Sequence, residues 1–333
     1  MEIKVSVLVP CYNNESTISR SIESIYSQKG NFKIELIVVN DGSLDSSRKI
    51  VEEWIPIFKL KGYELIYVEQ ENQGPGGAIN TGLKYVSGKY LTLLDADDCF
   101  LQSSIQKRVD YLEKNLDYVG VRTNGWKDKQ GKRKLFDLDP DRAINTNLFD
   151  GLIGGKATNW AGSYMIRTEV LFDFYPTREI YVSRFGQHMQ LLLPVAYKNK
   201  FGYIDEPLMI YFLQNNSHSQ ASTPEEQSTK DDRNFYGYYD IYIHMINEIV
   251  KDSEEKKYYL NIVESWKYRH ELKKAIEQRD KNNIQKYFKC YKLTGRVTLN
   301  EKIEIYSKIR PVRAMCLKCY RRMLMLLGYM RGK

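Results

Sequence analysis

The cluster Asp95-Ala96-Asp97-Asp98 has the clearest chemical meaning in this chain. It directly follows the apolar run Tyr90–Leu94, so a strand would deliver its carboxylates at the carboxyl end. Clustered carboxylate oxygens suit Mg²⁺ or Mn²⁺, which such sites often share with a phosphate-bearing ligand. The same residues are also typical of a turn that caps a helix. The elements around the cluster decide between these interpretations.

Three more polar turns follow strand-like runs in the first hundred residues. The predicted strands are Val5–Val9, Ile34–Val39, Tyr63–Val68 and Tyr90–Leu94, and helical patterns separate them at Glu15–Gln28, about 45–58 and Ala78–Val86. This βαβαβαβ order predicts a doubly wound, mostly parallel sheet, which binds ligands at the carboxyl ends of its strands. The turns at those ends are Pro10–Asn13, Asn40–Ser43, Gln70–Gly74 and Asp95–Asp98. Because they meet at one rim, we favour the metal and phosphate interpretation.

The pattern is mixed beyond residue 100. Extended pieces are predicted at Tyr118–Thr123, Ala161–Ile166 and Phe201–Leu208, with a helix at Phe185–Tyr197. The polar stretch Asn215–Lys230 reads as a loop or linker. Helical runs follow at Asp232–Val250, Glu254–Ile276 and Ile284–Leu293. We therefore expect an α/β domain over residues 1–220 and a helical, basic region over 221–333.

Composition narrows the class of protein. The net charge of +8 and the pI of about 8.9 favour an anionic partner. Five scattered cysteines do not suggest a disulfide framework and fit a reducing compartment. No apolar stretch approaches the roughly 20 residues that span a bilayer, so we expect a soluble or peripheral, cytoplasmic protein. The basic residues form no nucleic-acid readout motif, which disfavours a nucleic-acid binder.

The N-terminal half resembles a family 2 glycosyltransferase of the GT-A fold. Four ordered motifs carry the resemblance, densely over residues 3–100 and more weakly to about Ser219: Val7–Asn13, Val39–Ser43, Asn72–Gly82 and Gly88–Asp98. The resemblance implies a Rossmann-like mixed sheet with flanking helices. It also implies inverting, metal-assisted transfer from a nucleoside-diphosphate sugar, such as a UDP-sugar, to a glycan or lipid-linked acceptor. Such a reaction would serve the assembly of a surface polysaccharide or another glycoconjugate.

The resemblance also implies which residues would hold the nucleoside. Pro10, Tyr12 and Glu15 would contact it, and Asp41 would hydrogen-bond the base. The first turn lacks the glycine of a dinucleotide fingerprint, which agrees with a flat base lying against Tyr12. A Tyr12 ring that only covers the sheet edge is the alternative.

The metal and the donor pocket are assigned in the same way. Asp95 would face the ribose or the metal, and Asp97 would ligate the Mn²⁺ or Mg²⁺ that bridges the diphosphate. His218 resembles the late histidine that completes the metal or diphosphate site in some relatives, with a solvated loop histidine as the alternative. The Gly74–Gly77 loop and Asn80 would shape the donor pocket.

This sequence departs from the family pattern at one donor-site position. Most members carry arginine directly before the asparagine of the third motif, whereas this chain has Ile79. A contact to the diphosphate or base must then come from elsewhere, and Lys84 and Arg108 are candidates.

A second departure concerns the catalytic base. Gln187 and His188 stand where inverting relatives usually carry Glu-Asp at a helix start, and an amide cannot take a proton. Three explanations stay open: His188 is the base, the acceptor is already anionic, or a carboxylate comes from Asp173, Glu179 or Asp205. Gln187 and Gln190 lie three apart and are expected to bind sugar hydroxyls. A nucleotide-sugar-binding subunit that supports an active partner is the non-enzyme alternative.

Aromatic and basic residues outside the motifs allow further partners. Trp160 is suited either to stack on an acceptor sugar or to pack in the core. The tyrosines at 236, 238, 239 and 242 are expected to pack between helices. The final segment, from Arg310 to Lys333, is basic and amphipathic, which suits an anionic membrane surface at the inner face of the cell membrane. Packing on its own domain or on a second copy in a homodimer is the alternative.

Overall fold

We describe a computed structural model of the protein that covers residues 3–136, 147–157, 160–213, 224–309 and 311–326. The chain divides into two compact units, Met1–Met245 and Ile246–Lys333. Each unit is described by itself. The expected site residue His218 lies outside the described residues.

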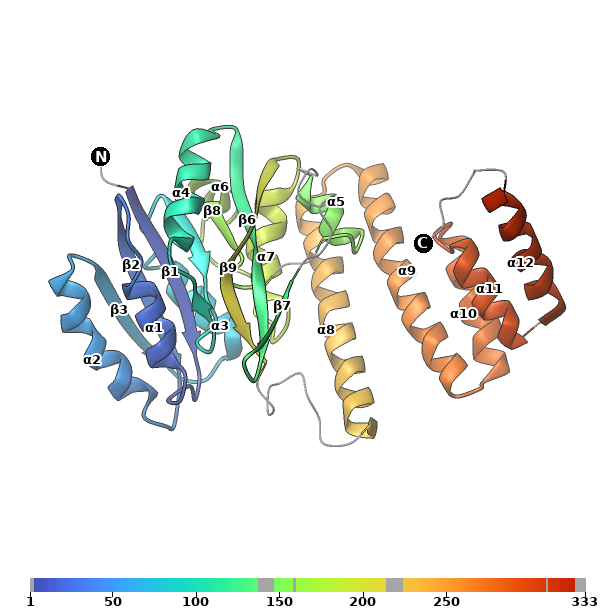
Figure 1. Cartoon of the computed structure of the whole chain (residues 1–333), viewed down its shortest axis with the longest axis horizontal. Helices are drawn as coiled ribbons and strands as arrows, with labels where there is room; N and C mark the ends of the chain where they lie inside the picture. The colour runs from blue at the N-terminus through green and yellow to red at the C-terminus, as the bar shows by residue number, and fades with distance from the viewer. Residues whose placement is uncertain (1–2, 137–146, 158–159, 214–223, 310, 327–333) are drawn as a thin grey trace. The chain divides into compact units, whose positions relative to one another are not determined.

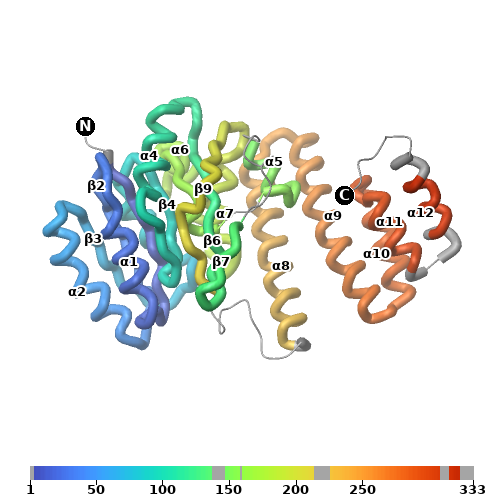
Figure 2. The backbone as a smooth tube through the Cα atoms, viewed as in Figure 1, coloured from blue at the N-terminus to red at the C-terminus, as the bar shows by residue number. Residues whose placement is uncertain are grey.

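The first unit is built on one mixed sheet of nine described strands (Figure 1). Eight of them follow the order β3-β2-β1-β4-β8-β6-β9-β5, and β7 pairs with β6. The strands are β1 Ile3–Cys11, β2 Phe32–Asp41, β3 Glu64–Gln70, β4 Tyr90–Leu93, β5 Cys99–Phe100, β6 Tyr118–Lys129, β7 Lys132–Leu135, β8 Tyr164–Arg167 and β9 Lys200–Phe212. The pairs among β1–β4 are parallel, as predicted, whereas β8 lies antiparallel to β4 and β6. Figure 2 shows the blue strands β1–β3 at one end of this sheet.

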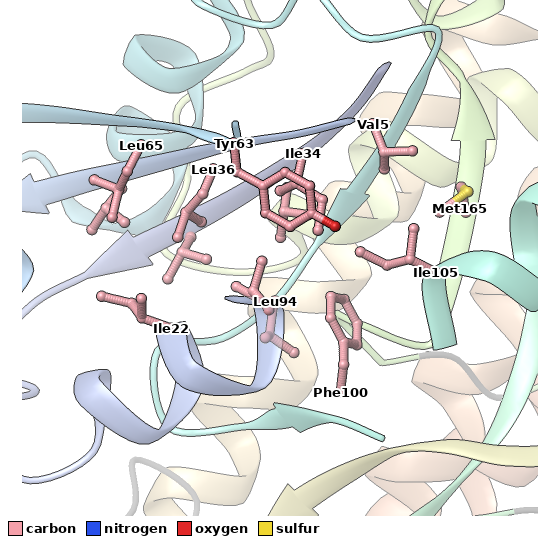
Figure 3. Packing of buried hydrophobic residues seen from close by; sticks show 14 of the residues in the cluster. Val5, Ile22, Ile34, Leu36, Tyr63, Leu65, Leu94, Phe100, Ile105 and Met165 are labelled. Carbon is pink, nitrogen blue, oxygen red and sulfur yellow. The ribbon is translucent and has the colours of Figure 1, made fainter. Parts of the chain in front are cut away.

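Helices cover both faces of the sheet because its parallel strands are buried on both sides. The helices α1 (Ile18–Tyr26), α2 (Ser47–Leu60) and α4 (Ser104–Lys114) contribute to one apolar cluster with alternate residues of β1 and β2 (Figure 3). In α1, buried isoleucines recur at helical spacing, which fixes its inner face. The opposite face of β1 packs on α3 (Gly74–Leu83), where a Cβ added to Gly82 would lie 2.2 Å from Leu8 Cδ1. The sheet is therefore rigid beneath the rim.

The helix α3 begins earlier than the sequence predicted. Gly74–Gly77, expected as a loop, forms its first turn. Pro75 suits that turn because its missing N–H would have no intrahelical partner there. A Cβ on Gly76 would approach Ser183 O to 2.7 Å, so a small residue lets the segment before α7 (Gln187–Ala196) cross this turn closely. The predicted loop is thus a helix start, and its glycines serve close packing.

The helix α8 (Pro224–Ile249) begins inside the predicted linker, and most of it lies in the first unit. The shorter helices α5 (Leu148–Ile153) and α6 (Thr168–Phe174) complete the described helices of this unit. The prediction of a linker was wrong for the start of α8, because the polar residues there show no apolar periodicity.

The second unit is helical. It contains α9 (Ser253–Glu277), α10 (Lys281–Leu293), α11 (Leu299–Ile309) and α12 (Pro311–Leu326). Asp252 and Asp280 cap α9 and α10 by accepting backbone N–H bonds. Its small core is formed by Leu272, Ala275, Ile284, Phe288, Tyr291, Ile305 and Tyr306. Among the described residues, every helix falls short of the length and apolar character needed to cross a membrane.

Candidate functional site

The loop after β1 is locked to the loop after β2 by reciprocal hydrogen bonds. Asn13 N–H donates to Ser43 Oγ at 2.9 Å, and Glu15 N–H donates to Asp45 Oδ2 at 2.9 Å. Ser46 N–H donates back to Glu15 Oε2 at 2.9 Å. Glu15, expected to hold a nucleoside, therefore supports the loop with one carboxylate oxygen. The same loop leaves Tyr12 45% exposed at the rim, where its ring is free to receive a flat ligand.

Asp41 joins the end of β2 to the start of α3. Its carboxylate is buried, and Oδ1 accepts from Gln70 Nε2 at 2.7 Å and from Gln73 N–H at 2.8 Å. Oδ2 accepts from Gly74 N–H at 2.8 Å, which satisfies a free donor of the first helical turn. Among the described residues, Gly74 N–H is the one hydrogen-bond donor to Oδ2, so a lone pair remains for a donor such as the N–H of a nucleobase.

The acidic turn after β4 is held from two sides. Asp98 N–H closes the turn on Asp95 O at 3.0 Å, and an Arg20 guanidinium nitrogen donates to Asp97 O at 2.8 Å. Asp98 is fully buried, and its Oδ1 accepts from Phe212 N–H at the end of β9 at 3.0 Å. Its Oδ2 has no hydrogen-bond partner among the described residues. The turn is therefore fixed before any ligand binds.

The carboxyls of this turn repel one another in a partly buried setting. Burial, together with the charge of Asp97, raises the pKa of Asp95 to about 7. Burial and the charges of Asp95 and Asp97 hold the pKa of Asp98 well above its usual range. A divalent cation would relieve this repulsion, and Asp95 and Asp97 keep partial exposure toward the rim. The residues present thus fit a metal that takes its remaining ligands from a diphosphate.

The protein alone does not offer a complete ligand set in the part that the structure describes. No group of three His, Cys, Asp or Glu side chains there is placed to hold a metal ion. This agrees with Mg²⁺-type sites, which use one or two carboxylates and complete the shell with water and substrate phosphates.

The structure distinguishes between the two residues, Lys84 and Arg108, that were candidates to replace the family arginine absent at Ile79. Arg108 is fully buried, donates to Gly162 O at 2.6 Å and has a pKa lowered to about 9 by burial, so the expectation that it reaches a diphosphate is wrong. Lys84 lies 3.7 Å from the exposed Glu179. The sequence analysis missed Arg184, an exposed residue whose Cγ lies 3.7 Å from the position of a Cβ on Gly74. The backbone N–H of Gly74 in turn donates to Asp41 Oδ2.

Asn80 supports the wall of this region. Its Nδ2 donates to Ile180 O at 3.0 Å and its Oδ1 accepts from Ile180 N–H at 2.7 Å. The amide is thereby engaged with the backbone of the segment that carries Arg184, so Asn80 shapes the pocket by holding that segment.

His188 lies in the first turn of α7, after Gly186 at a φ of +61°. Burial lowers the pKa of His188 to about 4, so its imidazole is neutral at neutral pH. Gln187 is half-buried beside it. Gln190 is fully buried and its Nε2 donates to Tyr181 O at 2.9 Å, which makes the expectation that it binds a sugar hydroxyl wrong.

The three carboxylates considered as alternative bases, Asp173, Glu179 and Asp205, lie in different surroundings. Asp205 Oδ1 accepts from Asn124 Nδ2 at 3.1 Å and from the Tyr203 hydroxyl at 3.4 Å. Asp173 is exposed on α6. Glu179, also exposed, lies beside Lys84.

Trp160 is already stacked within the protein. The Phe136 ring lies parallel to it at a centroid distance of 3.9 Å, and the Lys127 ammonium lies 4.7 Å from its centroid. These contacts occupy the ring surface that an acceptor sugar would need, which favours the packing alternative for Trp160.

The charge of the acidic turn acts on two tyrosines: Tyr211, which had no expected role, and Tyr238, which was expected to pack between helices. Burial is the main cause that raises the pKa of Tyr211 on β9 to about 12, and the charges of Asp98, Asp95 and Asp97 add to it. The pKa of Tyr238 on α8 is raised by burial and by Asp95. Because α8 follows the predicted linker, nothing in the local sequence signalled that Tyr238 returns to the site.

The comparison with protein families is decisive for classification. The model of "Glycosyl transferase family 2" matches residues 6–177, just over half of the chain. The chain belongs to glycosyl transferase family 2. The expected family is thereby confirmed.

Curated relatives of this family 2 chain share its N-terminal part. It is 41% identical over 103 residues to "Glycosyltransferase GlyA" of Streptococcus pneumoniae, which covers 31% of this chain and 14% of that protein. It is 36% identical over 138 residues to "Minor teichoic acid biosynthesis protein GgaA" of Bacillus subtilis, covering 39% of this chain and 30% of the relative. The match spans about a third or less of the length of each of the first curated relatives.

Solved structures support the fold over almost the whole chain. "S. aureus TarS 1-349 in complex with UDP-GlcNAc" superposes with a TM-score of 0.61 and 19% identity, covering 95% of this chain and 84% of that one. Mannosyltransferase PcManGT from Pyrobaculum calidifontis, in complex with GDP-Man and Mn²⁺, gives a TM-score of 0.52 and 16% identity, covering 95% and 87%. At these identities the likeness confirms the predicted GT-A-type architecture.

The contacts divide the expected residues of this family 2 chain into two groups. Tyr12 and Glu15 belong to one interlocked pair of loops, while Asp41 is tied to Gly74. Pro10 lies at the end of β1, paired with Val39 of β2. The second group comprises the acidic turn and His188, which lies beside Tyr238.

Proposed function

We propose that this family 2 chain is a metal-dependent glycosyltransferase that moves a sugar from a nucleoside-diphosphate sugar, with a UDP-sugar as donor. The observation that carries this proposal is the partly buried acidic turn Asp95–Asp98, held from α1 and β9. The ligands in the complexes of the structural neighbours, UDP-GlcNAc and GDP-Man with Mn²⁺, support a nucleotide-sugar donor. The acceptor is a saccharide or a lipid-linked molecule in the assembly of a surface polysaccharide or glycoconjugate, which the name of the GgaA relative supports.

The donor is held in two parts. The nucleoside lies against Tyr12 with the free lone pair of Asp41 accepting from the base, and Arg184 contributes the cation that the motif lacks at Ile79. Asp95 and Asp97 hold Mn²⁺ or Mg²⁺. When bound, this cation stabilises the negative charge that develops on the departing diphosphate.

His188 is the proposed base on the acceptor side. Its lowered pKa of about 4 gives the neutral imidazole roughly the basicity of an ordinary carboxylate. The imidazole therefore substitutes for the acidic residue usual at this position and takes the proton of the acceptor hydroxyl as the new glycosidic bond forms. Gln187 sits beside it to orient the acceptor.

Calorimetric titration with UDP, with and without Mn²⁺, tests the donor site. We expect UDP to bind tightly only with the metal, because the acidic turn repels a diphosphate without it. Equal affinity under both conditions would refute the assignment of the acidic turn as the metal site. A panel of UDP-sugars and GDP-mannose in the same assay identifies the donor.

A nucleotide-sugar-binding subunit is the second candidate function. The replacement of the usual acidic pair by Gln187 and His188 favours it. Metal-dependent hydrolysis of any UDP-sugar by the purified chain would exclude this alternative. Tight donor binding without turnover, even with a membrane fraction supplied as acceptor, would favour it.

We also propose that the C-terminal helix contacts an anionic membrane surface. Residues 305–333 contain eight Lys and Arg and no acidic residue, so the net charge of +8 resides entirely in this segment. On α12, Lys318 and Arg322 are exposed together with Met315 and Tyr320. Basic and apolar groups on one exposed helix suit adsorption to anionic lipid, which would bring a cytoplasmic enzyme to a lipid-linked acceptor.

Vesicle co-sedimentation tests this contact. We expect binding to vesicles that contain about 30–40% phosphatidylglycerol, because this lipid supplies a negative surface charge. We expect no binding to vesicles of phosphatidylcholine alone. The double variant Lys318→Glu/Arg322→Glu should lose the binding to anionic vesicles, while Lys286→Glu/Lys289→Glu on α10 serves as the charge-matched control. Equal sedimentation of both variants would reject α12 as the contact, and a concentration-dependent dimer of the wild type would favour the homodimer alternative.

A further inference from the structure

The helix α8 is fitted to the segment before α7 by two glycines. A Cβ on Gly237 would lie 2.2 Å from Phe185 Cδ2, and a Cβ on Gly186 would lie 2.9 Å from Ile241 Cγ2. Gly186 also has a positive φ of +61°, which other residues adopt at a cost. Each glycine thus makes room for a large side chain of the other element. Such mutual fitting fixes the position of α8 closely.

Two more contacts continue the same interface within the first unit. The His244 ring packs on the Tyr181 ring at 4.5 Å, and the Tyr175 hydroxyl lies 3.8 Å from Met245 Sδ. The contacts span two turns of α8. The helix is therefore a structural part of the wall that carries His188.

This docking places Tyr238 beside His188. Its ring centroid lies 6.4 Å from that of His188 and 6.3 Å from that of Phe185, and the residue keeps 38% exposure. The charge of Asp95 contributes to its raised pKa, so the phenol also senses the acidic turn. Besides burial, the charges of the acidic turn and of Tyr238 contribute to the raised pKa of Tyr211.

The proposed reaction requires an acceptor hydroxyl between the base and the sugar carbon of the donor. His188 marks the first position and Asp95 the second. Tyr238 lies beside His188, and the charge of Asp95 contributes to its raised pKa. An exposed aromatic ring at such a place offers a flat apolar surface to the C–H groups of a pyranose, with a hydroxyl available for hydrogen bonding.

We propose that Tyr238 of α8 is an acceptor-binding residue whose ring packs against a pyranose ring of the acceptor. This inference rests on the proposed glycosyl transfer and deepens it by naming the substrate class on the acceptor side.

The test compares Tyr238→Ala and Tyr238→Phe with the wild type. The donor is the UDP-sugar that the wild type hydrolyses fastest with Mn²⁺, and the acceptors are methyl pyranosides, with glycerol 3-phosphate as the acyclic, anionic arm. Tyr85→Ala is the matched control, because Tyr85 is similarly exposed but precedes β4 at the opposite end of the strands. UDP affinity and donor hydrolysis are measured for every variant.

We expect Tyr238→Ala to raise the KM for the best pyranoside by about tenfold. UDP affinity and donor hydrolysis should stay within about twofold, a change of less than half a kcal/mol that an acceptor contact would leave untouched. Tyr238→Phe keeps the ring and should stay near the wild type, as should Tyr85→Ala. A loss as large in Tyr238→Phe as in Tyr238→Ala would overturn the ring contact.

The remaining outcomes are equally informative. Unchanged transfer in Tyr238→Ala, or an equal loss of UDP affinity, would overturn the proposal. So would a wild type that transfers only to glycerol 3-phosphate, because that result favours an acyclic anionic acceptor. A wild type that neither binds UDP nor hydrolyses a UDP-sugar would instead reject the proposed function itself.

Discussion

The two sides of the candidate site are built in different ways. The donor side is formed by turns that directly follow four predicted strands, so neighbours in the motif are neighbours in the fold. The acceptor side is assembled from α7, β9 and α8, which follow one another along the chain and meet through side-chain packing. Strand ends converge by topology alone, whereas helix contacts depend on which residues leave room for each other.

The hydrogen bonds reflect the same difference. On the donor side, backbone N–H groups donate to Asp41, Asp45 and Glu15, so hydrogen bonds tie the loops together. On the acceptor side, His188 and Tyr238 are positioned by packing. We therefore expect changes on the donor side to alter binding of the nucleotide, and changes on the acceptor side to alter transfer.

Asp97→Ala should give the largest effect and act on the donor side only. Loss of second-shell partners of a metal typically costs about 10–100-fold, so loss of a direct ligand should cost at least about 100-fold in Mn²⁺-dependent UDP affinity. Calorimetry with UDP and Mn²⁺ measures it. Asp117→Ala, which removes an exposed carboxylate paired with Lys200, is the control. UDP affinity within threefold of the wild type would contradict the metal assignment.

His188→Ala should reduce kcat by about 10²-fold with little change in UDP affinity. The proton acceptor is the neutral imidazole, whose pKa is about 4. With saturating Mn²⁺ and donor, whose binding would keep Asp95 ionised, wild-type kcat should therefore persist as pH falls from 7 and decline only as pH approaches about 4. Rates measured across this range, with Gln187→Ala for comparison, decide the assignment. Near-normal turnover in His188→Ala would leave the anionic-acceptor or distant-carboxylate explanations.

The same histidine should affect stability with a defined sign. Its pKa is about 4 in the folded protein and near 6.5 when unfolded, so the unfolded chain binds more protons between these values. The contribution of His188 to stability is present above pH 6.5 and is lost as pH falls toward 4. Urea unfolding of the wild type and His188→Gln at several pH values measures this. A difference between them that does not change with pH would contradict burial of the imidazole.

Gly237→Ala should separate the two sides by disturbing α8. The added Cβ would overlap Phe185, and overpacking of this kind typically destabilises by about 1–3 kcal/mol. Transfer should fall while UDP binding persists. The double variant Gly237→Ala/Phe185→Ala should regain part of the thermal stability, because it restores space. A fully stable single variant would show that α8 does not rest on this contact.

Lys84→Ala should give the smallest effect. Its exposed ion pair with Glu179 contributes at most about 1 kcal/mol. Arg184→Ala, by contrast, should weaken UDP binding, and salt should reduce the difference because a charged contact is screened. Parallel titrations of both variants with UDP test the choice between these two cations. An equal result for both would remove Arg184 from the donor site.

The sequence predicted the strands that carry the donor-side turns well for a physical reason. Apolar runs that are separated by helical patterns specify β1–β4 and predict that these strands are parallel. Each run ends in a polar turn, whose side chains are not suited to the core. Asp41 and Asp97 could therefore be singled out without coordinates. The prediction failed at Gly74–Gly77, where turn-forming glycines serve helix packing, and at the linker, where a polar start concealed α8.

The sequence by itself determined the family, the α/β order and the acidic turn, because these follow from local periodicity and from residue types at strand ends. Only the tertiary structure decided that Arg108 is buried, that Asn80 holds the backbone at Ile180, and that Tyr238 stands beside His188. These facts depend on which distant surfaces fit together. Such fit arises from the shapes of side chains on both partners, and no single segment of the chain records it.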